Sequence, residues 1–372
     1  MRTAVTDLLG IDFPLLAFSH CRDVVAAVTN AGGFGVLGAS ALGPEQLDVD
    51  LRWIDEHVGG RPYGADVLVP ERTAGGGRGT DPAALVPEAH VRFAGELLEA
   101  HGLPAADARL APVRLGDPGT TADLLEVAFA HPIALIANAL GPPPEHLLAR
   151  ARRAGIPVAA LVGTRRHAER QLAAGVDLLV AQGGEAGGHT GEVGTMVLVP
   201  EVVAAAGGRV PVLAAGGIVT GRQIAAAVAL GADGAWTGSV WLTTEEAETA
   251  PATREKLLAA GSGDTVRSRG RTGKPARQLR SAWTDAWDDP AGPGALPMPL
   301  QSMLAEPTLR RVDAVAASGH DGARRLATYF VGQGVGMLDT VQPVHRVVEE
   351  MMEDFLLAVD RLHALTDAQG RR

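Results

Sequence analysis

The sequence predicts an α/β fold of the TIM-barrel type, a (β/α)₈ barrel with an insertion after the third strand and an irregular C-terminal cap followed by a helix. Three observations predict it. Eight short apolar runs alternate with helix-period segments up to about residue 260, their connections are short, and the helices repeatedly end in Ala-Gly or Leu-Gly before the next run. Ala, Val and Leu fill the apolar positions, which is typical of parallel strands covered by helices.

The eight expected strands are the apolar runs themselves. They cover residues 13–18, 34–39, 63–70, 133–139, 157–163, 177–183, 210–217 and 233–242. The helices between them are expected at 23–32, 44–57, 142–155, 165–175, 198–206 and 221–231, with prolines opening the third and glycines closing most of them. Together these units define a barrel over residues 1–260.

Two segments interrupt the alternation. Residues 71–120 are rich in Gly, Pro and Ala and contain one helical stretch at 90–102, which indicates an insertion after the third strand. Residues 261–345 show no clear period and are expected to form an irregular cap or lid. A helix from Val344 to Leu365 should then pack back on the barrel, so that residues 346–372 form a C-terminal helix and a frayed tail.

Composition excludes several classes of function. A formal net charge of −10 argues against a nucleic-acid surface. The basic segment Arg267–Arg280 is either a solvated face or a rim that attracts an anionic substrate. The single cysteine, Cys21, permits no intramolecular disulfide, and neither a signal peptide nor an apolar run of membrane-spanning length is visible. We therefore expect a cytoplasmic protein that acts on a small molecule.

Glycine-rich turns follow the last two expected strands. In barrels of this kind these are the strand ends that bind phosphate, because bare backbone N–H groups can approach an anion there. Gly216 and Gly217 follow the seventh strand, and Gly238 and Ser239 lie in the eighth run. We predict that these four residues bind a phosphate group. Tight turns alone would be the alternative explanation.

One glycine motif is rejected. Residues 33–38 match the G-x-G-x-x-G fingerprint of dinucleotide-binding folds, but that fingerprint must follow a strand and open a helix. Here it follows a helix and leads into a strand, so we interpret it as a turn.

The loop after the sixth strand, QGGEAGGHTG, is the most specific feature of the sequence. His189 lies between Gly187-Gly188 and Thr190-Gly191, and an imidazole can exchange a proton with a substrate carbon near neutral pH. Gln182, at the strand end, is a candidate partner for a polar heterocycle, although pairing with local backbone is the alternative. Glu185 is expected to form a structural pair or a helix cap.

These motifs carry a family resemblance. The loop QGGEAGGHTG, followed by VPVLAAGGI and GADGAWTGS, resembles the nitronate monooxygenase family, formerly called 2-nitropropane dioxygenases. The similarity covers most of residues 10–250, with weaker echoes in RSRGRTGKPAR and VGQGVGML. The resemblance implies FMN across the barrel mouth with its phosphate at the last two glycine turns. It also implies flavin contacts from Gln182, Gly187 and Gly188, and makes His189 the catalytic base or substrate-orienting group.

The sequence departs from the family at two strand ends. Phe18-Ser19-His20-Cys21 stands where the family commonly has a Pro-Met pair, and Asp66 stands where it often has Asn. A carboxylate at position 66 could accept from a flavin N–H but could not donate as Asn would. Ser19 and His20 become candidates for the substrate pocket, with a packing role as the alternative for His20. Cys21 is expected to be a buried, inert thiol. The chain thus belongs to a divergent subgroup.

The resemblance implies an FMN-dependent monooxygenase that oxidises alkyl nitronates, or nitroalkanes, with O₂ to a carbonyl compound and nitrite. The first alternative is an FMN-dependent enoyl reductase using NAD(P)H, since enoyl-ACP reductases share the EAGGH loop. A non-redox phosphate-binding barrel enzyme is a weaker alternative. We expect no metal, nucleic acid or membrane as partner, and a homodimer is one open assembly state.

Overall fold

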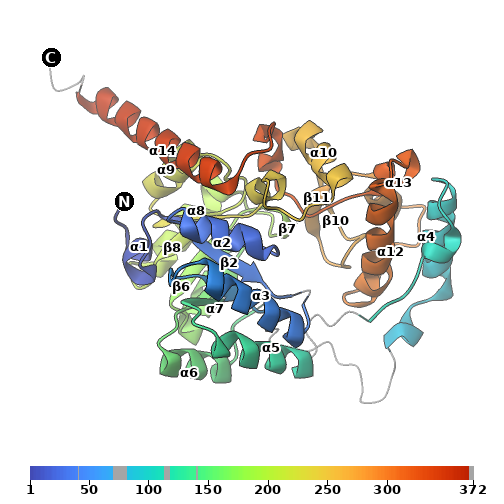
Figure 1. The fold of residues 1–372 in the computed structure, drawn as a ribbon, viewed down its shortest axis with the longest axis horizontal. Coiled ribbons are helices and arrows are strands. Elements are labelled where there is room, and N and C mark those ends of the chain that lie inside the picture. Colours follow the sequence, from blue (N-terminus) through green and yellow to red (C-terminus); the bar gives the residue numbers. More distant parts are fainter. Residues whose placement is uncertain (41, 70–81, 113–117, 140, 368–372) are drawn as a thin grey trace.

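Eight parallel strands form a closed barrel in the computed structural model, which describes residues 1–40, 42–69, 82–112, 118–139 and 141–367 (Figure 1). Each strand pairs with the next along the chain, and the last pairs with the first. The strands are β1 (Leu15–Ser19), β2 (Phe34–Gly38), β3 (Gly64–Asp66), β4 (Leu135–Asn138), β5 (Val158–Val162), β6 (Leu178–Gln182), β8 (Val212–Ala215) and β9 (Gly234–Thr237). The (β/α)₈ prediction is confirmed.

Alternate residues of each strand face the barrel interior, because successive side chains of a strand point to opposite faces. Phe34 and Val36 of β2 belong to the interior core, whereas Leu37 packs outward in another cluster with helix residues. Helix α1 (Ala4–Leu9) contributes Val5 and Leu9 to the same interior core. The amino-terminal helix therefore plugs the end of the barrel away from the strand carboxyl ends.

Helices cover the outside of the barrel. They are α2 (Arg22–Asn30), α3 (Pro44–His57), α5 (Pro118–Ala130), α6 (Glu145–Ala154), α7 (Arg165–Ala174), α8 (Thr195–Ala206) and α9 (Gly221–Ala229). Left-handed glycines cap several of them, including Gly155, Gly175 and Gly207, as the Ala-Gly endings predict. Helix α5 has no counterpart in the expected elements.

The last place in the ring of helices is taken by the C-terminal helix α14 (Val344–Asp367), which packs against α9 on one side and α2 on the other (Figure 1). A Cβ at Gly221 would lie 1.7 Å from the carbonyl oxygen of Met351, so only glycine permits this approach. Arg222 pairs with Asp354 across the same contact. The terminal helix thus packs on two of the barrel helices.

A cap beside the barrel mouth is built from two distant parts of the chain (Figure 1). The insertion contributes η1 (Pro82–Leu85), α4 (Glu88–Glu99) and η2 (Ala105–Asp107). The C-terminal part contributes α10 (Pro251–Ala259), η4 (Ser262–Asp264), β10 (Thr265–Ser268), β11 (Ala276–Leu279), α11 (Ala282–Asp288), α12 (Leu300–Ala316), α13 (Asp321–Leu326) and η5 (Gln333–Met337). Leu98 of α4 shares a separate hydrophobic core with Trp283, Trp287 and Leu304.

Residues 261–345 contain more regular structure than the sequence suggests. Helix α12 alone spans 17 residues, and β10 and β11 form a sheet with the short strand β7 (Gly188–His189) of the loop after β6. The expected helix at 90–102 is present as α4, whereas residues 70–81 and 113–117 of the insertion region, and 368–372 of the tail, lie outside the described residues. Of the rejected motif at 33–38, only Gly33 lies between α2 and β2, and residues 34–38 form β2 itself. The motif therefore follows a helix and runs into a strand, but the interpretation as a turn is wrong for residues 34–38.

Candidate active site

The predicted flavin residues meet at the mouth of the barrel, where the strand carboxyl ends lie. Asp66, Gln182 and Gly238 all share the inward parity of their strands or strand ends, because Ala65, Ala181 and Ala235 belong to outward-facing clusters. Asp66 is buried, while Gln182 and Gly238 are partly reached by solvent. The three positions therefore face inward at the same end of the barrel.

The turn after β8 is preformed. Gly216 and Gly217 have φ of 111° and 70°, a backbone region that favours glycine. Gln223 of α9 holds the turn: its Nε2 donates to the Gly217 carbonyl at 2.7 Å, and its Oε1 accepts from the backbone N–H of Val219. The turn thus presents bare backbone beside the start of a helix, as the phosphate prediction requires.

The turn after β9 has free space above it. A Cβ built at Gly238 would meet no atom within 4 Å. The Oγ of Ser239 accepts a hydrogen bond from the N–H of Gly332 in the cap at 2.8 Å, which leaves its own proton for another acceptor. The glycine is therefore not required by contacts within the described chain.

His189 lies on β7, whose partner strand β11 places Ala276 directly opposite it. Its Nε2 lies 2.9 Å from the Oγ1 of Thr272, and that hydroxyl donates in turn to the carbonyl of Lys274 at 3.1 Å. A hydroxyl has one proton, so Nε2 must supply the proton between the imidazole and Thr272. The remaining nitrogen, Nδ1, then carries a lone pair, and no described residue bonds it.

The imidazole of His189 is neutral at ordinary pH. Burial, together with the positive charge of Lys274, lowers its pKa to about 4. The exposed Lys274 ammonium also supplies a positive charge near the imidazole. The combination of a neutral base and a nearby cation suits an anionic or acidic-carbon substrate.

Hydrogen bonds hold the loop that carries His189 in place. Glu185 accepts from the backbone N–H and hydroxyl of Thr195, and so caps α8 as expected. Arg277 donates to the Gly184 carbonyl at 2.8 Å, and Arg267 donates to the Thr190 carbonyl at 3.1 Å. Two residues of the basic segment, Arg267 and Arg277, thus support this loop, whereas Arg269, Lys274 and Arg280 are exposed.

The weak family echo VGQGVGML packs against the same loop. A Cβ at Gly187 would lie 2.9 Å from the backbone of Val331, and a Cβ at Gly332 would lie 2.6 Å from the Glu185 carbonyl. Gly188 instead has open space at its Cβ position, with φ of 77°. Of the two predicted flavin glycines, Gly187 is explained by contact with the cap and Gly188 is not.

His20 stands at the rim of the mouth. Its Nδ1 donates to the Gly38 carbonyl at 2.9 Å, and its ring lies edge-on to Phe18 with centroids 5.1 Å apart. Solvent reaches the ring, yet the surrounding protein lowers its pKa. The ring thus packs on Gly38, and its Nε2 has no hydrogen-bond partner among the described residues. Ser19 is engaged locally, since its Oγ accepts from the N–H of Cys21.

A buried ion pair beside His20 was not anticipated from the sequence. The Arg271 guanidinium forms two hydrogen bonds to Glu306, at 2.8 and 3.1 Å, and lies over the Phe330 ring. Arg271 is buried and its charge, with that of Glu306, acts on His20. Phe330 in turn lies 6.3 Å from the His189 ring. Thr272 and Phe330 were also missed, and the echo RSRGRTGKPAR was the only signal for the first.

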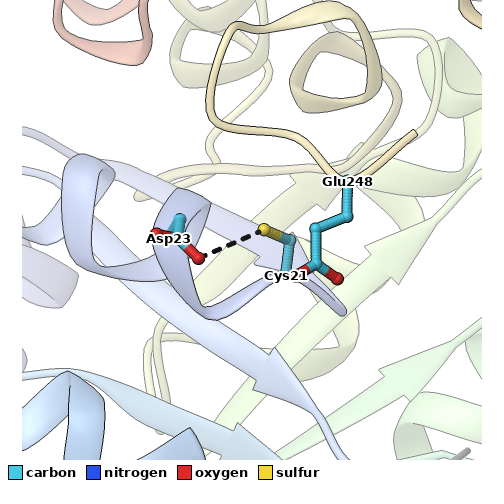
Figure 2. A group of neighbouring side chains, drawn as sticks. All are labelled: Cys21, Asp23 and Glu248. Atoms are coloured by element: carbon cyan, nitrogen blue, oxygen red, sulfur yellow. Dashed lines mark hydrogen bonds between the residues drawn. The ribbon is translucent and has the colours of Figure 1, made fainter. Parts of the chain in front are cut away.

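Cys21 is a protonated thiol. Its Sγ donates to the Glu246 carbonyl at 3.2 Å and faces the carboxylates of Asp23 and Glu248, as Figure 2 shows. Burial raises the thiol pKa, and the Glu248 charge acts in the same direction. The structure agrees with an unreactive thiol.

The chain is similar in sequence to proteins of a known family. A sequence model described as nitronate monooxygenase matches residues 2–354. The chain belongs to the nitronate monooxygenase family. It is therefore a flavin-dependent oxidoreductase. Among curated relatives, it is 57% identical over 98% of its length to Rv1533 of Mycobacterium tuberculosis, a protein assigned provisionally as a monooxygenase, of which the match covers 99%.

Two solved structures are similar to this chain in sequence and in fold. A nitroalkane oxidase of Streptomyces ansochromogenes is 26% identical, with a TM-score of 0.81 over 97% of this chain and 100% of that one. FabK of Thermotoga maritima is 27% identical, with a TM-score of 0.73 over 98% of this chain and 99% of the other. In the described part of this chain, no helix is long and apolar enough to cross a membrane.

The residues at the mouth fit a flavin on two observations. The turns after β8 and β9 offer bare backbone, and space is left at Gly238. Asp66 has a buried carboxyl oxygen, Oδ1, that receives no hydrogen bond from any described residue. An unsatisfied buried polar atom of this kind is costly unless a partner binds there.

Proposed function

We propose that the protein is an FMN-dependent nitronate monooxygenase, which converts alkyl nitronates, and nitroalkanes after loss of a proton, to a carbonyl compound and nitrite with O₂. The observation that carries the proposal is the neutral imidazole of His189, oriented by Thr272 at the barrel mouth. When bound, the flavin supplies the electron acceptor and the reaction with dioxygen.

The phosphate of FMN would bind at Gly216 and Gly217 after β8 and at Gly238 and Ser239 after β9. Support comes from the positive φ values of the first pair, the space at the third and the free hydroxyl proton of the fourth. Gln182, inward at the end of β6, would meet the polar part of the ring, as would Gly188.

His189 acts on the substrate through Nδ1. The lone pair on this atom removes the α-proton of a neutral nitroalkane, whereas a nitronate that arrives already ionised is attracted by the Lys274 ammonium near the imidazole. Lys274 favours an anion near the imidazole and also keeps the imidazole unprotonated. His20 and Ser19, at the rim, contact the substituent of the substrate.

The second candidate is an FMN-dependent enoyl reductase that uses NAD(P)H. The likeness to FabK, whose identity to this chain is similar to that of the nitroalkane oxidase, favours it. In that reaction His189 would protonate or orient the substrate double bond. Its neutral form at ordinary pH suits the base role better than the acid role.

One pair of measurements decides between these functions. We expect the FMN-loaded protein to consume O₂ and release nitrite with a small panel of alkyl nitronates, without pyridine nucleotide. We expect NADH or NADPH, mixed anaerobically, to bleach the flavin slowly. Rapid bleaching with no nitronate-dependent O₂ uptake would establish the reductase, and failure to bind FMN at all would refute both. The cytoplasmic location and the homodimer stay predictions.

A further inference from the structure

Asp66 is the last residue of strand β3, and its side chain lies inside the barrel mouth. Its Cα pairs with Gly38 of β2 and with Ala137 of β4. Ala65 packs outward among the surrounding helices, so Asp66 points inward, where it is 6% exposed. Its Oδ1 has no hydrogen-bond partner among the described residues. An ionised carboxylate in this position would lose its hydration without gaining donors in return.

No charged group among the residues that the structure describes compensates Asp66. The His20 ring packs on Gly38 of β2 and is neutral. Its Nδ1 donates its proton to the Gly38 carbonyl. On β4 the neighbouring polar side chain is Asn138, whose Oδ1 accepts from Val69. The Arg271–Glu306 pair acts on His20, whereas burial alone raises the pKa of Asp66 to about 7.

We infer that Asp66 binds the flavin ring as a neutral carboxylic acid, and that cofactor binding therefore takes up a proton. This inference rests on the proposed FMN site. A neutral carboxyl offers one O–H donor and one C=O acceptor, as an amide offers both kinds of group. The polar edge of a flavin presents ring carbonyls and an imide N–H, which a carboxylic acid satisfies together. A carboxylate only accepts and would repel the ring carbonyls.

The test is an FMN titration of the full-length, cofactor-stripped protein between pH 6 and pH 8, followed by quenching of flavin fluorescence. If the bound form is protonated, the dissociation constant of the wild type should rise about tenfold over this range, because ionisation of the free carboxyl competes with binding. Asp66→Asn keeps donor and acceptor without titrating. Dividing the wild-type constant by that of Asp66→Asn removes the titration of the FMN phosphate itself.

A second measurement needs no variant. Calorimetric titration of the wild type at pH 7.5 in two buffers of different ionisation enthalpy should show uptake of about 0.7 proton per FMN. A pH-independent affinity ratio, an affinity that rises with pH relative to Asp66→Asn, or proton release on binding would each overturn the inference while leaving the FMN site intact. Absence of FMN binding in both proteins at every pH would instead refute the proposed function.

Discussion

Replacing Asp66 by Asn should stabilise the cofactor-free protein, and more so as the pH rises. Burial raises the pKa of this carboxyl from its ordinary value of about 3.9 to about 7 in the folded chain. A group whose pKa is raised by folding favours the folded state below its unfolded pKa, and that contribution is lost as the pH rises through the folded value. Ionising Asp66 in the folded protein therefore costs roughly 4 kcal/mol in full, at about 1.4 kcal/mol per pKa unit.

Most of this cost appears between pH 5 and pH 9, where linkage gives about 2.5 kcal/mol. A chain of 372 residues has an unfolding entropy near 0.8 kcal/mol/K, so the difference corresponds to about 3 °C in melting temperature. Differential scanning calorimetry of both apo proteins at the two pH values measures it. Because every other titrating group is common to both proteins, only the change in the gap between them matters.

The control is Asp123→Asn, which removes an exposed carboxyl on helix α5. Its melting temperature should follow that of the wild type at both pH values. If the gap between wild type and Asp66→Asn is the same at pH 5 and pH 9, then Asp66 is not a desolvated carboxyl and the reasoning from its burial fails.

Four further predictions concern the site. His189→Asn should retain FMN absorbance but lose about 10²-fold or more in turnover with neutral nitroalkanes, and unchanged turnover would remove His189 from the mechanism. For the wild type, kcat/KM with these substrates should fall as the pH drops through about 4, where His189 is protonated; an acid limb near the ordinary histidine pKa would contradict the environment described. Thr272→Val should lower turnover about tenfold through loss of one orienting hydrogen bond, with FMN affinity unchanged; equal loss of FMN would indicate a structural role instead. Gly238→Val should fold normally, since a Cβ there meets no atom within 4 Å, yet bind FMN poorly; stoichiometric FMN in this variant would place the phosphate elsewhere.

The barrel could be predicted from the sequence because its signals are local. Each buried strand is a short apolar run bounded by glycine or proline. The dinucleotide fingerprint at residues 33–38 could be rejected because the motif follows a helix and runs into a strand. Helix α5 was missed because its second half, LLEVAFA, is apolar on most sides and shows little helical period. Strand β7 has only two residues, too few for any periodic pattern.

Some residues of the candidate site could be recognised from local sequence, and others are brought to it only by the fold. Gln182, His189 and the glycine turns stand beside one another in recognisable loops, so the sequence alone places them at strand ends. The partners of His189 come from Thr272 and Lys274, more than 80 residues away, and only the pairing of β11 with β7 brings them together. The raised pKa of Asp66 could not be predicted from the sequence, because burial is a property of the folded barrel and leaves no trace in the residue type.

The divided cap has a consequence for how the chain is made. Helix α4 leaves the ribosome about 200 residues before α12, the helix with which it shares a core. At roughly 5–20 residues per second of synthesis, its apolar face waits some 10–40 seconds before the α12 part of this core is made. Slowed elongation between the two segments should therefore lower the yield of active protein, and a chaperone that shields nascent apolar helices should restore it.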